Sequence, residues 1–474
     1  MKKAWKALGI TTILIAGIIG GCAKSPETPA VIHVAPADTE SEETGSFEQP
    51  FTDIAEALEL AVPGTTILLH EGKYPPFTVT ETASGTETAP VVLRAAEGER
   101  AVICGKDGED SPTVLLENTE NFTLQGIEID GGGYGIFYLA AEDNGDHPLR
   151  NVTIADCTVH GIRGTHGICV YAENAEAPLQ NLTVSGCEIY DCLCGSSESL
   201  ALNGNIDGFT VSGNRIHDND NIGIDMIGFE GTACHDKSYE GNPYDADFVR
   251  NGKCCGNVVY RISAQGNEAY YHDGEYDLCA DGIYVDGGQN IEIYENFVFC
   301  CDIGIEVATE QRAEDNELFS VSGIEVHDNV ICGCRGWCGI AFGGYDADRG
   351  FTENCVFRNN TLIDNGVQIA VQRSRNNRIE NNLCIGASGV EFSDVIREED
   401  MINQFGANLW ESDSDADTLF ETGSFDRTRI FPAETLQKVI PIDAGQINCI
   451  PPASDGFGSS YMPSKEDIAL YQSE

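Results

Sequence analysis

The chain has 474 residues, and 77 Asp and Glu against 27 Lys and Arg give it a formal charge of −50 at neutral pH. This charge argues against nucleic acid as a partner, because nucleic-acid binding depends on basic side chains that neutralise phosphates. An anionic ligand would need a local basic group or a bridging divalent cation. A surface of this charge is typical of a soluble monomer.

Residues 1–21 have the layout of a bacterial signal peptide. A lysine-rich start and an apolar run over residues 7–19 lead into Ile19-Gly20-Gly21-Cys22. These four residues resemble the lipobox of lipoproteins, which would make Cys22 the lipidated first residue of the mature protein; the alternative is a plain secretory signal. We expect an exported protein at the bacterial cell surface or outside the cell, held at the membrane only by its lipid. Residues 22–45 would be a flexible tether.

Residues 46–112 are predicted to form an N-terminal cap and the first coils of the body. Ile54, Leu58 and Ala61 lie on one face of a predicted helix over residues 51–62, with Thr52 as its N-cap. A strand follows at residues 66–70. The helix is expected to cover the open end of the body, since terminal repeats must shield their edge from pairing.

From about residue 113 to 395 the chain repeats one phrase: an apolar residue, two others, Asn or Cys, one other, and an apolar residue. The central positions are Cys157, Cys187, Asn214, Asn257, Asn296, Asn329, Asn360 and Asn382. A repeat of this length indicates a solenoid with one supersecondary unit per coil. Alternation around each phrase indicates strands, and no coil has room for a substantial helix. The sequence therefore predicts an all-β fold, a parallel β-helix.

The 19 cysteines of an exported chain would ordinarily suggest disulfides. Here Cys and Asn alternate at equivalent turn positions, both in the phrase and in a second ladder five residues later. The second ladder reads Cys192, Asn219, Cys301, Cys334 and Asn365. Stacked free thiols fit these positions better than disulfides or a zinc site, whose partner spacing is missing.

The runs Phe47 to Ala57, Pro63 to Ile67, Gly72 to Tyr74 and Pro90 to Ala95 resemble the N-terminal segment of secreted right-handed parallel β-helix proteins in the pectate lyase-like superfamily. The resemblance covers about residues 46–395. It implies a right-handed coil and an extracellular polysaccharide as partner. It does not select an activity, because this segment serves lyases, hydrolases and epimerases alike.

Two insertions, residues 229–252 and 262–279, lengthen neighbouring coils, and loops on a rigid scaffold are the usual place for function. If Ile224, Ile283 and Ile305 point inward, the residues that follow them point outward between the insertions. The sequence therefore predicts an acidic groove. Its expected metal ligands are Asp225, Asp281, Asp286, Glu306 and Glu310, with Tyr284 and Glu230 as substrate-binding residues.

One interpretation of this groove is Ca²⁺ with a base. Calcium binds carboxylate oxygens and could bridge them to a uronate, whose α-proton it would acidify for β-elimination. The base must have a tunable pKa. Candidates are Lys253, Lys237, Arg250 and His272, of which the two lysines stand out because residues 108–437 contain no others.

The stretch Asn219 to Asp225 also resembles the calcium-binding run of family nine pectate lyases, in which a nearby Lys is the base. Asn219, Gly223 and Asp225 match, whereas two consecutive Asp positions of that run hold Asn221 and Ile222. The resemblance implies a lyase that cleaves a uronate-containing glycan by β-elimination, and this is the leading hypothesis.

Two alternatives remain open. Asp225 with Asp286 or Glu306 could act as the paired carboxylates of an inverting glycoside hydrolase. The protein could also be a glycan-binding surface lipoprotein without catalytic activity. Residues 396–474 are expected to form a C-terminal cap or tail.

Overall fold

The computed structural model describes residues 31–36, 43–106, 108, 111–233, 246–311, 319–345, 350–385, 388–392, 401–406 and 408–411. The predicted signal peptide with Cys22, residue Lys237 and the chain beyond residue 411 lie outside these residues. Within the described ranges, no helix has the length and apolar character needed to cross a membrane.

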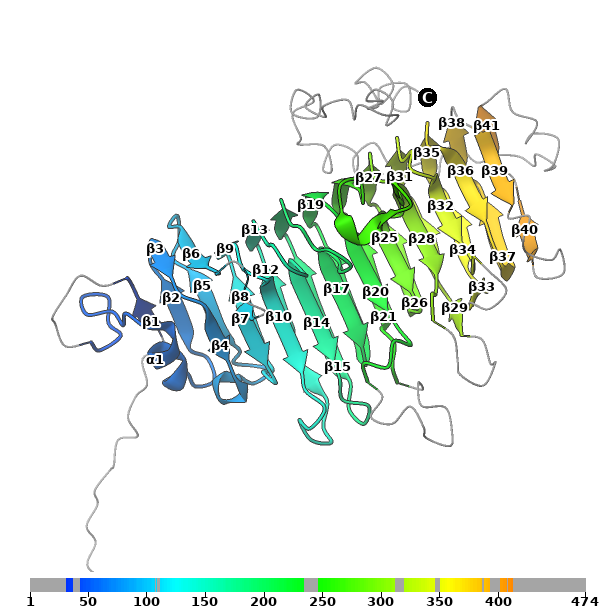
Figure 1. Cartoon of the computed structure of the whole chain (residues 1–474). Helices are drawn as coiled ribbons and strands as arrows, with labels where there is room; N and C mark the ends of the chain where they lie inside the picture. Colours follow the sequence, from blue (N-terminus) through cyan, green and yellow to red (C-terminus); the bar gives the residue numbers. More distant parts are fainter. Residues whose placement is uncertain are drawn as a thin grey trace, which may run out of the picture.

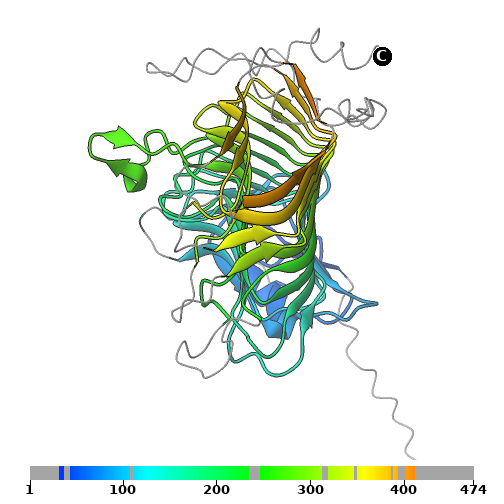
Figure 2. The ribbon, with the colours of Figure 1, turned by 90° about the vertical axis from the view of Figure 1, so that its right-hand side faces the viewer.

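The chain forms an elongated coil of strands, which confirms the predicted parallel β-helix (Figure 1). Three parallel sheets line the coil, named here sheet A (16 strands), sheet B (12 strands) and sheet C (11 strands). Each full coil contributes to sheets A, B and C in that order, and the view in Figure 2 shows successive coils stacked on one another. The chain therefore has three strands per coil, including a short one directly after each ladder residue.

Sheet A consists of β1 (Val31–Val34), β2 (Thr66–Leu69), β5 (Val91–Ala95), β8 (Phe122–Gln125), β11 (Leu149–Arg150), β12 (Val152–Ala155), β15 (Leu179–Ser185), β18 (Ile206–Ser212), β21 (Arg250–Cys255), β26 (Gln289–Tyr294), β29 (Ser320–Ser322), β30 (Glu325–His327), β33 (Phe351–Glu353), β34 (Val356–Arg358), β37 (Ser374–Glu380) and β40 (Met401–Phe405). Sheet B consists of β3 (Gly72–Tyr74), β6 (Ala101–Cys104), β9 (Glu128–Asp130), β13 (Thr158–His160), β16 (Glu188–Tyr190), β19 (Arg215–Asn219), β22 (Val258–Ile262), β27 (Phe297–Phe299), β31 (Val330–Cys332), β35 (Thr361–Ile363), β38 (Leu383–Ile385) and β41 (Leu409–Glu411).

Sheet C consists of β4 (Phe77–Val79), β7 (Pro112–Glu117), β10 (Tyr134–Ala140), β14 (Ile168–Ala172), β17 (Leu200–Gly204), β20 (Ile224–Ile227), β25 (Asp281–Asp286), β28 (Ile303–Ala308), β32 (Cys338–Phe342), β36 (Val367–Val371) and β39 (Ser388–Phe392). A separate antiparallel hairpin, β23 (Tyr271–His272) and β24 (Glu275–Tyr276), belongs to the second insertion. Two 3₁₀ turns, η1 (Glu81–Ala83) and η2 (Glu268–Tyr270), lie between strands.

The α-helix near the N-terminus, α1 (Ile54–Glu59), is shorter than predicted. Its N-cap is Asp53 rather than Thr52, because Asp53 is extended and its Oδ1 accepts a hydrogen bond of 2.9 Å from the Ala55 amide. The helix packs against β1, β4 and η1. A capping helix over the end of the coil is therefore not evident, and the first strand of sheet A is β1.

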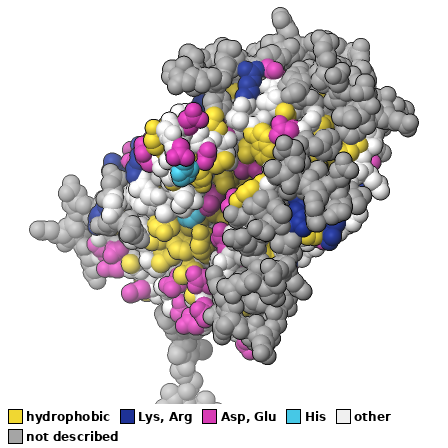
Figure 3. Space-filling view, turned by 45° about the vertical axis from the view of Figure 1, so that its right-hand side comes forward, with side chains coloured by type: hydrophobic (Ala, Val, Ile, Leu, Met, Phe, Trp, Pro, Cys, Tyr) yellow, Lys and Arg dark blue, Asp and Glu magenta, His cyan; other side chains and the backbone are white. Residues whose placement is uncertain are grey.

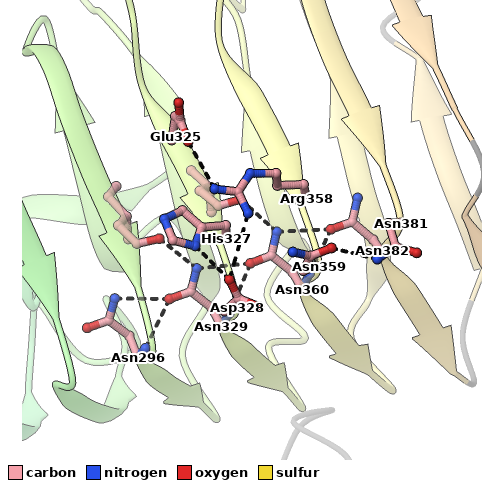
Figure 4. Close-up of polar contacts among 12 residues, drawn as sticks. Asn296, Glu325, His327, Asp328, Asn329, Arg358, Asn359, Asn360, Asn381 and Asn382 are labelled. Carbon is pink, nitrogen blue, oxygen red and sulfur yellow. Dashed lines mark hydrogen bonds and ion pairs between the residues drawn. The ribbon is translucent and has the colours of Figure 1, made fainter. Parts of the chain in front are cut away.

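The predicted asparagine ladder is confirmed, and Figure 4 shows its central part. Each ladder Asn is almost completely buried and accepts, at its Oδ1, a hydrogen bond from the backbone amide of the ladder residue one coil earlier. Its Nδ2 donates back to a carbonyl of the preceding coil, as from Asn329 to Ile293 at 2.9 Å. The ladder continues to Asn408, one coil beyond the predicted repeat.

The residue before each ladder position adopts the left-handed conformation, which explains why that place holds Gly, Asp or Asn in most coils. Asp328 and Asn359 are examples, with φ of 54° and 57°. The thiol prediction is also confirmed, because every cysteine in the described ranges is free. Cys187 occupies a ladder position, and its backbone amide donates a hydrogen bond of 2.9 Å to Asn214 Oδ1.

The ladder predicts a large loss of stability for Asn329→Ala. The substitution leaves the Ile293 carbonyl and the Asn296 amide without their buried partners, and also removes the bond from Asn329 Nδ2 to Asn360 Oδ1. We expect urea unfolding to show a loss of about 3 kcal/mol or more. The matched control is Gln265→Ala, which removes an exposed amide side chain and should cost less than about 0.5 kcal/mol. Equal losses for both variants would contradict the structural role of the ladder.

Candidate functional site

The outer face of sheet C carries a row of polar residues across three adjacent strands. Asp225 of β20 pairs with Tyr284 of β25, which pairs with Glu306 of β28. The neighbouring Ile224, Ile283 and Ile305 are fully buried in the core, so the predicted orientation of this row is confirmed.

The two insertions lie at opposite ends of these strands, one after the C-terminal end of β20 and the other before the N-terminal end of β25. The first follows β20 and leads into sheet A, and the second leads from β22 of sheet B into β25. Asn221, at the edge of sheet C, donates 3.1 Å to the hydroxyl of Tyr270 in the second insertion. His272 lies in the β23–β24 hairpin, where it is exposed and pairs with Glu275. Figure 2 shows this hairpin projecting from the coil.

Several carboxyl groups are buried together on this face. Asp225, Asp281 and Asp286 are 3%, 2% and 6% exposed. Burial raises the pKa of each well above its ordinary value, and neighbouring carboxylates raise it further: Glu198 beside Asp225, Glu306 beside Asp281, and Glu310 beside Asp286. These groups therefore hold protons at pH values where an exposed Asp is ionised.

Glu306 and Asp281 form a proton-sharing pair. Burial, followed by repulsion from Glu310, raises the pKa of Glu306 to about 7, while a hydrogen bond with Asp281 partly opposes this rise. In this pair Asp281 is the donor, because its own pKa lies well above the ordinary value. Glu306 thus has a pKa near neutrality, which suits a group that must exchange a proton during a reaction.

Two further residues, Glu198 and His166, lie on the same face and were not predicted as site residues from the sequence. His166 Nδ1 is 3.3 Å from Glu198 Oε2, and its Nε2 is 3.2 Å from the Tyr171 hydroxyl. Burial lowers the pKa of His166 to about 4, so the ring is neutral at pH 7. Burial, together with repulsion from Glu230, raises the pKa of Glu198 to about 8.

A sequence signal for these residues exists. His166 and Asp281 each stand directly before the Gly-Ile pair that opens a strand of sheet C. In the coil that follows His166, Ser199 stands where that Gly would be, so the Gly-aliphatic pattern skips this coil and Glu198 escapes notice. The register Ile168 to Leu200 places Glu198 beside His166.

Hydrogen bonds also join the other two predicted acids, Glu230 and Glu310, to this face. Glu230 accepts a hydrogen bond of 2.7 Å from Asn203 Nδ2, and the backbone amide of Glu310 donates 2.9 Å to Asp286 Oδ1. Both glutamates are exposed. Asp225, Asp281, Asp286, Tyr284, Glu306, Glu230 and Glu310 are therefore brought together, as the sequence predicts.

The predicted bases lie elsewhere. Lys253 is in β21 of sheet A, where it pairs with Thr210 and Glu292, and its Nζ is 3.5 Å from Glu292 Oε2. Arg250 begins the same strand and donates 2.9 Å to Asn205 Oδ1. The first insertion ends before β21, earlier than predicted, so both side chains belong to a different sheet from the carboxyl groups.

Sheet C is also devoid of basic side chains. None of the residues in its 11 strands, all within the described part of the chain, is Lys or Arg. In Figure 3, acidic and hydrophobic side chains lie next to one another over the middle of the described surface, and the Lys and Arg side chains in view lie away from them. The carboxyl groups are thus crowded without a cation from their own sheet.

The donor chemistry of this face suits calcium, since Asp225 Oδ1, Asp281 Oδ1 and Asn221 Oδ1 are buried oxygens with no hydrogen-bond partner. The arrangement of the side chains does not suit calcium. Across the described ranges, no group of three or more His, Cys, Asp or Glu side chains could hold a metal ion. Calcium therefore remains a prediction from sequence.

Comparison with known proteins places this face in context. Residues 32–246 match the family described as Pel9A-like, right handed beta helix region, and residues 240–415 match the family described as Periplasmic copper-binding protein (NosD). The chain is 32% identical over 439 residues to the uncharacterized protein YwoF of Bacillus subtilis (strain 168), with 87% of each chain covered. It is 26% identical over 193 residues to pectate lyase PEL9 of Emericella nidulans, covering 37% of this chain and 46% of that protein.

Solved structures share the fold. Pectate lyase Pel9A superposes with a TM-score of 0.50 at 18% identity, covering 85% of this chain and 87% of that one. The GH136 lacto-N-biosidase from Eubacterium ramulus superposes with a TM-score of 0.56 at 14% identity, covering 80% and 67%. The β-helix is thus shared with a polysaccharide lyase and with a glycoside hydrolase.

The buried acids predict a specific pH dependence of stability. A carboxyl group whose pKa is raised by folding stabilises the protein fully below its unfolded pKa, about 4.3 for Glu, and this contribution is lost as pH rises through its folded value. For Glu198 the folded pKa is about 8. The variant Glu198→Gln stays neutral, so its unfolding free energy should fall less than that of the wild type between about pH 5 and 8. Chemical denaturation at several pH values measures this, with exposed Glu59→Gln as the control; parallel curves for Glu198→Gln and wild type would contradict the burial of this acid.

Proposed function

The chain belongs to the family of YwoF and carries a Pel9A-like right-handed β-helix region, and from this premise we propose that it is a carbohydrate-active enzyme that hydrolyses glycosidic bonds with paired carboxyl groups. One observation carries the choice of hydrolysis. The buried carboxyl groups of raised pKa lie on a sheet whose strands contain no Lys or Arg. Buried carboxyl groups of raised pKa suit general acid–base chemistry, whereas the β-elimination predicted from the sequence relies on a lysine, an arginine or His272 as the base.

We assign the roles of general acid to Asp225 and general base to Glu306. Asp225 holds its proton because of burial and the nearby Glu198, and Glu306 has a pKa of about 7. The two residues are two strand intervals apart, roughly 9–10 Å between their main chains at about 4.8 Å per interval. This spacing lies near the upper end of the separation of about 6.5–9.5 Å found in inverting glycosidases.

The reaction balances with these two groups. Asp225 donates its proton to the glycosidic oxygen as the bond from that oxygen to the anomeric carbon breaks. A water molecule attacks the same carbon from the opposite side, and Glu306 accepts the proton that the water loses. Asp281 is a positioning residue, because its hydrogen bond keeps Glu306 ionised and oriented. Exchange with solvent then returns both carboxyl groups to their starting states.

A lyase acting on a uronate-containing glycan is the second candidate. It is supported by the Pel9A-like region and the 26% identity to pectate lyase PEL9. It would require a base, and the bases proposed from sequence in the described ranges, Lys253, Arg250 and His272, are not placed among the carboxyl groups. Binding of a glycan without cleavage is the remaining alternative.

The proposed cellular context follows from the N-terminal residues. A lipobox-like run ending at Cys22 supports export and a lipid anchor, which would hold the enzyme at the cell surface. An extracellular polysaccharide is the corresponding partner. A lipid attached to Cys22 would be detected as an added mass on the N-terminal peptide of the native protein.

The assignment predicts opposite outcomes for two variants. Glu306→Gln should lower kcat by about 100-fold or more, because it removes the general base. Lys253→Ala should leave kcat unchanged, because its side chain lies on sheet A. Activity is measured on neutral and uronate polysaccharides by the release of reducing ends and by the ultraviolet absorbance of unsaturated uronides.

Thermal unfolding of both variants controls for folding. Reducing ends of inverted anomeric configuration without unsaturated product would support hydrolysis. An unsaturated product that disappears in Lys253→Ala and persists in Glu306→Gln would overturn the assignment in favour of the lyase.

A further inference from the structure

Aromatic residues flank the carboxyl cluster on the side toward the N-terminus. Tyr134 and Phe137 of β10 are nearly parallel, with ring centroids 5.9 Å apart and planes inclined by 13°. Tyr171 of β14 meets Phe137 edge to face at 5.5 Å. The three rings are partly exposed and rest on buried Cys169, Ala201 and Ile227. These rings form what we call the tyrosine patch, which Tyr171 connects to His166 and Glu198.

A second apolar patch lies on the other side of the cluster. Trp337, directly before β32, is partly exposed and packs with Val367 on buried Ile303, Cys338 and Ala370. Its indole Nε1 donates 3.2 Å to Glu391 Oε1 on the same face. We call this the tryptophan patch. An aromatic ring beside hydrogen-bonding carboxyl groups offers both an apolar surface and polar contacts.

The order of strands in sheet C fixes the distance between the patches. From β10 to β32 there are six strand intervals, in the order β10, β14, β17, β20, β25, β28 and β32. At about 4.8 Å per interval the patches are roughly 29 Å apart along the axis of the coil. Asp225, Tyr284 and Glu306 lie between them. A ligand that reaches both patches must be a chain of several sugars.

Unsatisfied hydrogen-bond acceptors lie between the two patches. Asn203 Oδ1, Asn221 Oδ1, Asp225 Oδ1 and Asp281 Oδ1 belong to side chains that are at most 3% exposed, and they have no hydrogen-bond partner in the described structure. Buried acceptors without partners are unfavourable, so they call for donors from a ligand or water. Sugar hydroxyl groups are such donors.

The negative charge of this face favours uncharged sugars over anionic ones. Strands of sheet C contribute no Lys or Arg, and the arginines nearest in sequence to its N-terminal ends, Arg163 and Arg335, pair with Asp191 and Asp364. A uronate would therefore meet carboxyl groups with no compensating cation from the sheet. An uncharged sugar avoids this repulsion.

We infer that the outer face of sheet C binds an uncharged glycan of several sugars that lies along the axis of the β-helix, with its rings on the tyrosine and tryptophan patches. This inference deepens the proposed function. It rests on that function only in placing the bond that is cleaved beside Asp225 and Glu306, between the two patches. It makes Tyr134, Phe137 and Trp337 specificity-determining residues outside the carboxyl cluster.

The test uses the full-length Glu306→Gln variant, which should bind without cleaving. Calorimetric titration with hexasaccharides of glucose, xylose, mannose and galactose is compared with hexagalacturonate, each in EDTA and in calcium chloride. We expect at least one uncharged hexasaccharide to bind in EDTA and its disaccharide to bind much more weakly. Adding Phe137→Ala or Trp337→Ala should weaken binding by about five-fold or more, whereas the exposed control Phe47→Ala should not change it.

Each outcome is decisive when the variants unfold at the wild-type temperature. Tighter binding of hexagalacturonate, no binding of any uncharged hexasaccharide, or binding that is unaffected at both patches would overturn the inference. Binding of an uncharged glycan that the wild-type protein leaves intact would sustain the inference while refuting the proposed hydrolysis.

Discussion

The stacking of buried amides from coil to coil is the interaction on which the rest of the structure depends. A ladder Asn in this fold has no access to water, so its carbonyl oxygen and its amino group must both find partners in the adjacent coils. Only one alignment of neighbouring coils satisfies them. A slip by one residue would leave these groups unpaired and turn the apolar side chains of every strand outward.

This fixed register also generates the candidate site. Residues far apart in sequence, such as Glu198, Asp225 and Glu306, come to lie on the same face because the coils that carry them are aligned by the same ladder. Strands of sheet C hold Asp225, Asp281, Asp286 and Glu306 on a rigid sheet, while Glu198 lies just before a strand. Their crowding is tolerated because burial and mutual repulsion keep some of them protonated, which reduces the net charge of the cluster.

Family relationship and site chemistry lead to different expectations in this protein. The Pel9A-like region is a likeness to pectate lyases, while the strands of the sheet that carries the carboxyl groups contain no Lys or Arg. The same fold supports both a pectate lyase and a lacto-N-biosidase among solved structures, so the coil itself does not select the reaction. The choice depends on which side chains protrude from sheet C.

The sequence by itself determined the parallel coil, the ladder, the free thiols and the outward row of Asp225, Tyr284 and Glu306, because alternation and repeat spacing are local properties that fix which face a side chain takes. It did not determine that Lys253 belongs to sheet A. The strand β21 begins at Arg250, a few residues earlier than the predicted end of the insertion, and this places Lys253 in a sheet rather than in a loop. It also did not reveal Glu198, which follows no visible repeat because Ser199 replaces the usual Gly. Only the tertiary structure decided which acids are close together and how deeply they are buried, and these two quantities set their protonation because charge repulsion and desolvation depend on three-dimensional distance and on exclusion of water.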